Sequence, residues 1–375
     1  MRQAFLFFIC VLLFVPEVTA LPRFALRGGS SQCIDCHVNP TGGAMRNRGG
    51  WSFGKTVLPM YPTDREFKMS NSIGENIQFG LDFRGQYLGV FTDSTAKTDF
   101  QKMTGSIYTN VDFAENISAF ARYDFIWGIW EAYAIARILP NGGYLKGGTF
   151  QPNYGIRLDD HTAYTRGGDL GVLFSTGQRQ GLIYEPRYVE TGIEAGAYIS
   201  DFALLTASVG NPRSQQFVTE PTYTVNLQIT RSIGENFSFM FGSSAAIFRM
   251  QRLNANFQQE FPQVKMYGGY AGFSIGEFVL LGEYDISQDY LKKDSSASAM
   301  MIEASYKIVD GLEAVVRYDR FDRNTKVEKD ELQRFVIGFE FVPYSFVEVR
   351  PQFRIQLEEP AVQNNSFVVQ FHLYY

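Results

Sequence analysis

From about residue 76 to the end of the chain, apolar and polar side chains alternate, and this alternation is the most constraining feature of the sequence. In the first such stretch, Ile77, Phe79 and Leu81 fall on one face, whereas Gln78 falls on the other. A period of two residues is typical of a β-strand that is apolar on one face only. The pattern therefore predicts a long series of amphipathic β-strands.

The composition agrees with strands that face lipid on one side and water on the other. The 375 residues include 34 Phe, 21 Tyr and 35 Gly, yet the mean hydropathy stays slightly negative at −0.14. Many aromatic residues without long apolar runs are typical of membrane β-barrels. The net charge of −5 is mild and gives no reason to expect a nucleic-acid partner.

Turn signals divide the alternating region at regular intervals. Longer polar loops are expected at residues 92–102, 211–220 and 322–331. Seven short turns are expected at residues 115–116, 140–143, 200–201, 234–236, 276–277, 310–311 and 343–344. Seven short turns, with both termini on the same side, imply about 16 strands, and bacterial barrels have even numbers of strands. We therefore expect an all-β fold, an antiparallel transmembrane β-barrel over residues 76–375, with its short turns facing the periplasm.

Charged side chains fall on one face of these strands. Val349 and Phe353 share an apolar face, whereas Arg350 and Arg354 fall on the opposite face. An Arg or Lys that faces lipid at mid-bilayer costs about 2–4 kcal/mol, so the charged face should line the lumen. The alternative is a soluble β-sandwich, which would turn the apolar face inward.

The chain ends in an alternating run that reaches its last residue, Tyr375, with Phe367 and Phe371 on the apolar face. It resembles the closing strand of bacterial barrels. Closure against the first strand would remove an edge that otherwise invites aggregation. An ordinary edge strand at the end of a soluble domain is the alternative.

Residues 1–20 have the features of a secretory signal peptide. Arg2 precedes an apolar run over residues 4–15, and residues 18–20 form a small-residue cleavage site. At about 12 residues the run is short for a membrane-spanning helix. We expect the mature chain to begin at Leu21 and Cys10 to leave with the signal.

Two cysteines then remain, Cys33 and Cys36, and His37 directly follows the second. This arrangement is the attachment motif of a c-type haem, in which the thiols bond to the haem vinyl groups and the imidazole binds iron as the proximal ligand. A C-x-x-C disulfide and half of a zinc site are the alternatives. Zinc would need four ligands, and the next histidine, His161, lies far along the sequence. A redox C-x-x-C usually follows a strand, and residues 28–31 do not have that pattern.

The run of residues 33–49 resembles the N-terminal motif of bacterial outer-membrane β-barrel proteins that bear a single c-type haem. Some of these proteins are similar to the porin partners of porin–cytochrome electron conduits. The rest of the chain resembles the family in its barrel pattern and in the segment Asp159-Asp160-His161-Thr162. The resemblance implies transport of electrons or small solutes across the outer membrane and does not choose between them.

We expect a signal peptide over residues 1–20, a haem c-binding segment with a linker over 21–75, and the barrel over 76–375. Residues 49–72 contain glycines and prolines without a period, and they predict an irregular linker. Residues 151–189 form a polar insertion that is too irregular for a strand. A loop of this length caps the mouth of a barrel or folds into its lumen. It is either a solvated loop held by Asp–Arg pairs or a constriction of the lumen.

One covalent haem c is expected, held by Cys33 and Cys36 with His37 on the iron. The candidates for the distal iron ligand are His161, His372, Met45, Met60 and Met69. By the alternation of the last strand, His372 faces the lumen and lies within about 10 Å of the periplasmic rim. The haem itself precedes the first strand, so it should lie on the periplasmic side, at or inside the barrel mouth.

The leading hypothesis is a haem c-bearing, porin-like protein of the outer membrane that takes part in electron transfer. A single haem cannot bridge a hydrocarbon layer of about 30 Å, so periplasmic and extracellular cytochromes would be partners alongside the lipid. The alternative is a passive solute porin whose haem segment is a plug or an anchor. An enzyme such as a peroxidase would want a distal acid–base group over an open iron site, and no enzymatic activity is expected.

Overall fold

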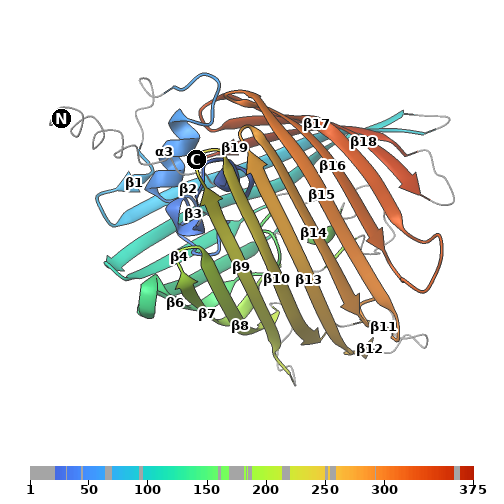
Figure 1. The fold of residues 1–375 in the computed structure, drawn as a ribbon, viewed down its shortest axis with the longest axis horizontal. Helices are drawn as coiled ribbons and strands as arrows, with labels where there is room; N and C mark the ends of the chain where they lie inside the picture. Colours follow the sequence, from blue (N-terminus) through green and yellow to red (C-terminus); the bar gives the residue numbers. More distant parts are fainter. Residues whose placement is uncertain are drawn as a thin grey trace.

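The computed structural model describes residues 22–30, 32–43, 45–63, 70–92, 96–158, 162–168, 181–182, 184, 188–212, 220–249, 252–253, 259–291, 293–358 and 364–375. In this part of the chain, sixteen antiparallel strands form a closed barrel (Figure 1). The first long strand, β2 (Ile77–Phe91), pairs with the last, β19 (Ser366–Tyr374), so this sheet has no open edge. The expected antiparallel barrel of about 16 strands is confirmed.

The barrel strands follow one another in sequence order around the wall. Between β2 and β19 they are β3 (Ala96–Ala114), β4 (Ile117–Asp124), β5 (Ile129–Ala136), β6 (Tyr144–Phe150), β7 (Glu190–Ser200), β8 (Ala203–Pro212), β9 (Thr222–Ile233), β10 (Phe237–Arg249), β13 (Gln263–Ile275), β14 (Phe278–Gln288), β15 (Ser296–Val309), β16 (Leu312–Asp322), β17 (Leu332–Tyr344) and β18 (Val347–Glu358). Three short strands lie outside the barrel series: β1 (Ser72–Ile73), which pairs with β2, and the hairpin of β11 (Arg252–Leu253) and β12 (Gln259–Glu260).

The seven expected short turns all join consecutive strands, with small shifts in position. The turn after β17 lies at residues 345–346 rather than 343–344, because β17 continues to Tyr344 and Phe346 adopts the left-handed φ of +65°. The turn after β7 lies at residues 201–202, one residue later than expected. The loop expected at residues 92–102 is shorter than expected, since β3 already begins at Ala96.

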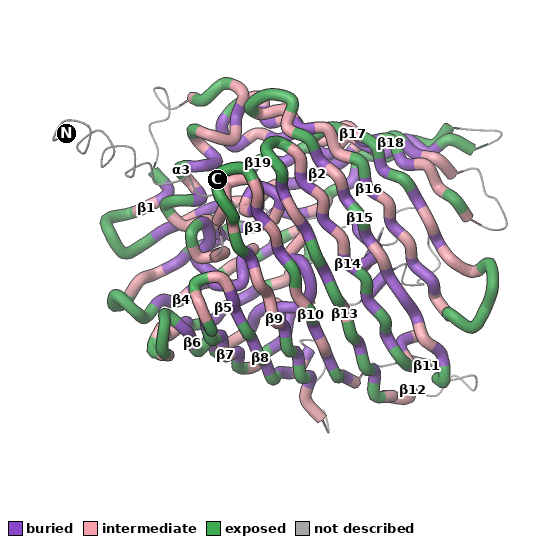
Figure 2. The backbone as a smooth tube through the Cα atoms, viewed as in Figure 1, coloured by how far each residue is buried: buried purple, intermediate pink, exposed green. Residues whose placement is uncertain are grey.

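Burial alternates along the strands in the way the sequence pattern predicts, and Figure 2 shows buried and exposed positions following each other on the barrel wall. Phe353 and Phe371 are 40% and 49% exposed, whereas the neighbouring Arg354 and Glu348 are buried. A β-sandwich would bury the phenylalanines instead. The charged faces therefore line the inside of a barrel, and the sandwich alternative is wrong.

Two described helices lie before the barrel, α2 (Pro22–Arg27) and α3 (Arg48–Thr56). The described residues also form three short 3-10 helices: η1 (Cys33–Asp35), η2 (Pro140–Gly142) and η3 (Tyr164–Arg166). Helix α3 corrects the irregular linker expected over residues 49–72. Its glycines are poor helix formers, but the Asn47 side chain caps it by accepting a 3.0 Å hydrogen bond from the Gly50 N–H. The Trp51 ring packs on Phe346 and Tyr375, so tertiary contacts outweigh the weak local propensity. None of the described helices is long and apolar enough to cross a membrane.

Candidate functional site

The residues Cys33 to His37 form one tight turn. The backbone N–H groups of Cys36 and His37 both donate to the Cys33 carbonyl, at 3.2 and 2.9 Å. Both cysteines are free thiols. Burial raises the pKa of the Cys33 thiol to about 11 and that of Cys36 to about 12, so both stay protonated at neutral pH. The turn thus gathers two neutral thiols and an imidazole within five residues.

A small hairpin-like loop fixes this turn from its C-terminal side. His37 and Arg46 form an antiparallel bridge, and the Val38 N–H donates to the Met45 carbonyl at 3.2 Å. Asn47 adds a 2.6 Å hydrogen bond from its side-chain amide to the Ile34 carbonyl. These contacts join the residues on the two sides of a small loop, 37–38 and 45–47.

The loop packs on the strands near the short-turn end. Val38 and Met45 are buried in an apolar cluster with wall residues of β3 to β8, namely Tyr108, Phe120, Tyr133, Ile135, Tyr144, Phe150, Tyr198 and Leu204. Gln32 donates to the carbonyl of Asp201 in the turn after β7, and Ser232 at the end of β9 donates to the Gly29 carbonyl. The Cys33–His37 turn thus lies inside the barrel mouth at the end that carries the short turns.

A cavity of about 400 Å³ opens beside His37 at this end. Its lining is mostly polar and comes from the motif, from β2 and β3, and from the turns that follow: Ile34, His37, Val38, Asn47, Asn76, Gln78, Asn110, Asp112, Phe113, Ala114, Glu115 and Arg137. The guanidinium of Arg137 donates to the Val38 carbonyl at 3.3 Å and so ties the motif to the wall. The His37 side chain therefore lies beside the cavity.

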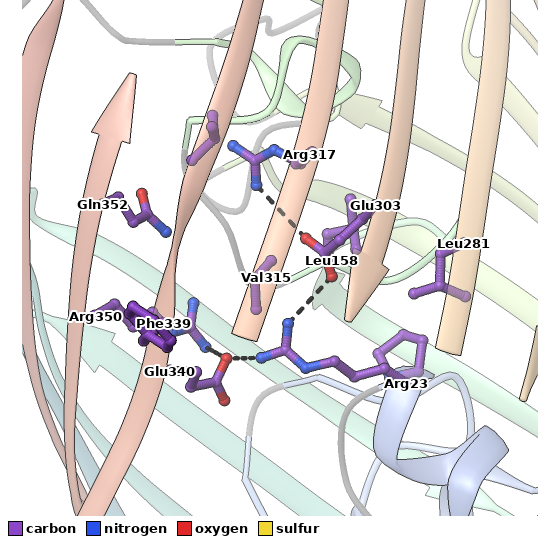
Figure 3. A pocket seen from close by; sticks show the side chains of 12 residues that line it. Arg23, Leu158, Leu281, Glu303, Val315, Arg317, Phe339, Glu340, Arg350 and Gln352 are labelled. Carbon is purple, nitrogen blue, oxygen red and sulfur yellow. Dashed lines mark hydrogen bonds and ion pairs between the residues drawn. The ribbon is translucent and has the colours of Figure 1, made fainter. Parts of the chain in front are cut away.

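Helix α2 lies inside the lumen and is held there by buried charges (Figure 3). The guanidinium of Arg23 pairs with Glu303 of β15 at 3.1 Å, with Glu313 of β16 at 3.4 Å, and with Glu340 of β17. Arg27 also pairs with Glu313. All three side chains that surround Arg23 are at most 10% exposed. Sequence analysis did not single out Arg23, although the inward-facing glutamates of three adjacent strands were a signal for a buried cation.

The described residues of the insertion at 151–189 contact the inner wall on two sides of the barrel. Near its start, the Asn153 side chain donates to Thr206 of β8 at 3.1 Å, and Arg166 pairs with Glu283 of β14 at 2.7 Å. Thr162 receives hydrogen bonds from Arg334 of β17 and Arg354 of β18, on the far side of the barrel from β6 and β7. The described polar groups of this segment bond to the wall, and the choice between a solvated loop and a constriction of the lumen stays open.

The candidates for a distal iron ligand lie in different places. Met45 is in the apolar cluster beside the motif, and the Met60 N–H donates to Val342 at the short-turn end. His372 is buried on the lumen face, as expected. Its Nδ1 lies 2.7 Å from Glu348, and its Nε2 lies 3.2 Å from both Arg84 and Asp82, contacts that suit a wall residue. His161 and Met69, with Asp159 and Asp160, lie outside the described residues. The distal ligand therefore stays a prediction.

Among the described residues around the motif, several side chains have a buried hydrogen-bond donor without a partner, including Thr41 Oγ1, Tyr133 Oη, Arg157 Nη1 and Tyr198 Oη. Thr41 belongs to the motif loop, and the two tyrosines belong to the apolar cluster beneath it. Within the described ranges, no group of three or more His, Cys, Asp and Glu side chains is arranged to hold a metal ion. The neighbourhood of Cys33 is thus rich in donors.

Several solved structures share this barrel. OprB of Pseudomonas putida has a TM-score of 0.58 at 8% identity, with 80% of this chain and 94% of that chain covered. The chain has the fold of bacterial outer-membrane porins. OmpT of Vibrio cholerae matches with a TM-score of 0.56 at 12% identity over 82% of this chain and all of that one. An anion-selective porin from Comamonas acidovorans matches with a TM-score of 0.54 at 9% identity over 80% and 98%. No protein-family model and no curated protein matches the chain.

Proposed function

We propose that this porin-like barrel carries one covalent haem c and transfers electrons at or across the outer membrane. The observation that carries the proposal is the Cys33–His37 turn, held inside the barrel mouth with both thiols free. The secretory signal expected at residues 1–20 would agree with export into an oxidising compartment. The short-turn end would face the periplasm, as it does in bacterial barrels.

The residues around the turn suit a haem with its two acidic side groups. Cys33 and Cys36 would hold the group through thioether bonds, and His37 would bind the iron as its proximal ligand. When bound, haem c supplies a one-electron redox centre whose potential the axial ligands and surroundings set. The unpartnered donors near Cys33 are the groups that a carboxylate would need.

The rest of the N-terminal segment packs against the turn and would position it. A Cβ at Gly50 of α3 would lie 2.2 Å from the Cys36 carbonyl oxygen, so α3 packs directly on the turn. On the other side, α2 and the insertion occupy the lumen, where Leu26, Ile156 and Ala163 share one apolar cluster. Segments inside the lumen hinder the free diffusion of large solutes.

The redox partners follow from the distance to be crossed. A single haem near one mouth cannot span a hydrocarbon layer of about 30 Å. Cytochromes on the periplasmic side, and acceptors or donors beyond the membrane, would supply the other redox centres. We assign the chain a role as an electron carrier rather than as an enzyme.

A passive solute porin is the second candidate function. It is favoured by the names of the structures that share the fold, which include an outer membrane channel of Acinetobacter baumannii and the anion-selective porin. In that case the N-terminal segment would be a structural plug in the lumen.

Proteoliposomes decide between the two functions. The haem-loaded protein is reconstituted together with a partner cytochrome at its long-loop end, which supplies the redox centres that a single haem lacks. A reduced periplasmic cytochrome is enclosed on the short-turn side, and a soluble ferric chelate is added outside. The proposal expects oxidation of the cytochrome that disappears in the double variant Cys33→Ser, Cys36→Ser. Equal oxidation rates in both proteins, or solute swelling that is fast and independent of the haem, would favour the passive porin.

A further inference from the structure

Arg157 of the insertion lies against the motif loop. A Cβ built at Gly43 would lie only 2.6 Å from Arg157 Nε, and one at Gly42 would lie 3.9 Å from its Cγ. Gly43 has a φ of +69° and Gly42 a φ of +79°, in the left-handed region that residues with a Cβ rarely adopt. The missing Cβ atoms leave room for the Arg157 side chain. The guanidinium is also close enough to Cys33 to act electrostatically on its thiol. The insertion thus brings a cation to the place where haem would attach.

The Nη1 atom of Arg157 is buried and has no hydrogen-bond acceptor. Two carboxylates of the nearby wall are paired elsewhere, since Glu194 lies 2.6 Å from Lys146 and Glu131 lies 3.7 Å from Arg122. Leaving a buried donor of a charged group unpaired is costly, because the atom has lost its water and gained no acceptor. A ligand that brings an acceptor would remove this cost.

The neighbouring groups point to the chemical class of that acceptor. The hydroxyls of Thr41, Tyr133 and Tyr198 are also buried without a hydrogen-bond partner. A guanidinium and three hydroxyl donors suit a carboxylate, because an ionised carboxylate accepts several hydrogen bonds at once. A haem bound at Cys33 and Cys36 carries two propionate carboxylates.

We propose that Arg157 binds a propionate carboxylate of the haem, so that the lumen insertion forms part of the haem site. This inference rests on the proposed function. Through Arg157, the haem is linked to a segment that bonds to the opposite wall at Thr162. The insertion then both narrows the lumen and adjusts the charge around the redox centre.

The test measures the reduction potential of the full-length, haem-loaded protein in detergent by spectroelectrochemical titration. Arg157→Gln should retain covalent haem, measured by its pyridine haemochrome spectrum, but lower the potential. Loss of a nearby positive charge favours the ferric state, and a tenfold shift in the reduction equilibrium equals about 59 mV for one electron. Arg157→Lys keeps the charge and should restore most of the potential.

The control is Arg231→Gln, which removes an exposed guanidinium that stacks on Phe202 at 4.9 Å, and it should leave the potential unchanged. If Arg157→Gln does not assemble, Gly43→Ala tests the same contact, since its Cβ would displace the guanidinium and should lower the potential in the same direction. A potential equal to that of the wild type in the variant that assembles would overturn the role of Arg157. Absence of covalent haem from the wild type would instead overturn the proposed function.

Discussion

Single residues hold the N-terminal segment in the barrel through buried charge and close packing. Arg23 is surrounded by three glutamates from adjacent strands, and a buried ion pair that loses one partner leaves uncompensated charge. We expect Arg23→Gln to lower the free energy of unfolding by about 3–5 kcal/mol, measured by urea titration in lipid vesicles. The matched control is Arg249→Gln, whose partner Glu220 is 45% exposed, and it should lower the free energy of unfolding far less, because water screens an exposed ion pair. Equal losses in both variants would contradict the role of Arg23 as a buried anchor.

Close packing at Gly50 gives a second prediction at this scale. A Cβ there would lie 2.2 Å from the Cys36 carbonyl oxygen, a backbone atom that cannot move away without disturbing the turn. Gly50→Ala should therefore reduce the fraction of purified protein that carries haem, measured by the ratio of haem to protein absorbance. Gly147→Ala is the control, because a Cβ at that position of β6 would meet nothing within 4 Å. A normal haem content in Gly50→Ala would show that α3 does not support the turn.

At the scale of elements, the closing strand completes the barrel. Residues of β19 pair with β2 from Ser366 to Tyr374, and the Tyr375 N–H donates to the Leu81 carbonyl at 2.9 Å. Without residues 371–375 the ladder groups near the rim would face lipid unpaired, which is strongly unfavourable. We expect this truncation to abolish the heat-modifiable gel migration of a folded barrel. Normal levels of folded, membrane-inserted protein after the truncation would contradict closure by β19.

The strands could be predicted from the sequence, whereas helix α3 and the contacts inside the lumen could not. Alternation and turn residues predict the strands, because both are local signals, and even the lumen position of His372 follows from them. Helix α3 was missed because its glycines carry no helical period, and its packing on Phe346 and Tyr375 depends on the far end of the chain. The contacts of Arg23 and Arg157 were missed for the same reason, since their neighbours lie on distant strands or in another segment.

At the scale of the whole molecule, helix α2 and the described residues of the insertion both lie inside a barrel of porin fold. The insertion runs from β6 to bonds with β17 and β18, and α2 packs on the wall that includes β15 to β17. We expect planar bilayers with the wild-type protein to show low conductance, and replacement of residues 153–187 by a short Gly-Ser linker to raise it several-fold. Equal conductance of the two proteins would mean that the insertion does not limit passage through the lumen.

The most direct test of the account is whether haem stays on the polypeptide after denaturation. The protein is produced with the host's cytochrome c maturation system, outer membranes are purified, and the pyridine haemochrome spectrum and haem staining of denaturing gels are recorded. The account predicts one covalent c-type haem per chain in the wild type and none in the Cys33→Ser, Cys36→Ser variant, with both barrels still heat-modifiable. A folded wild-type barrel without covalent haem would contradict it.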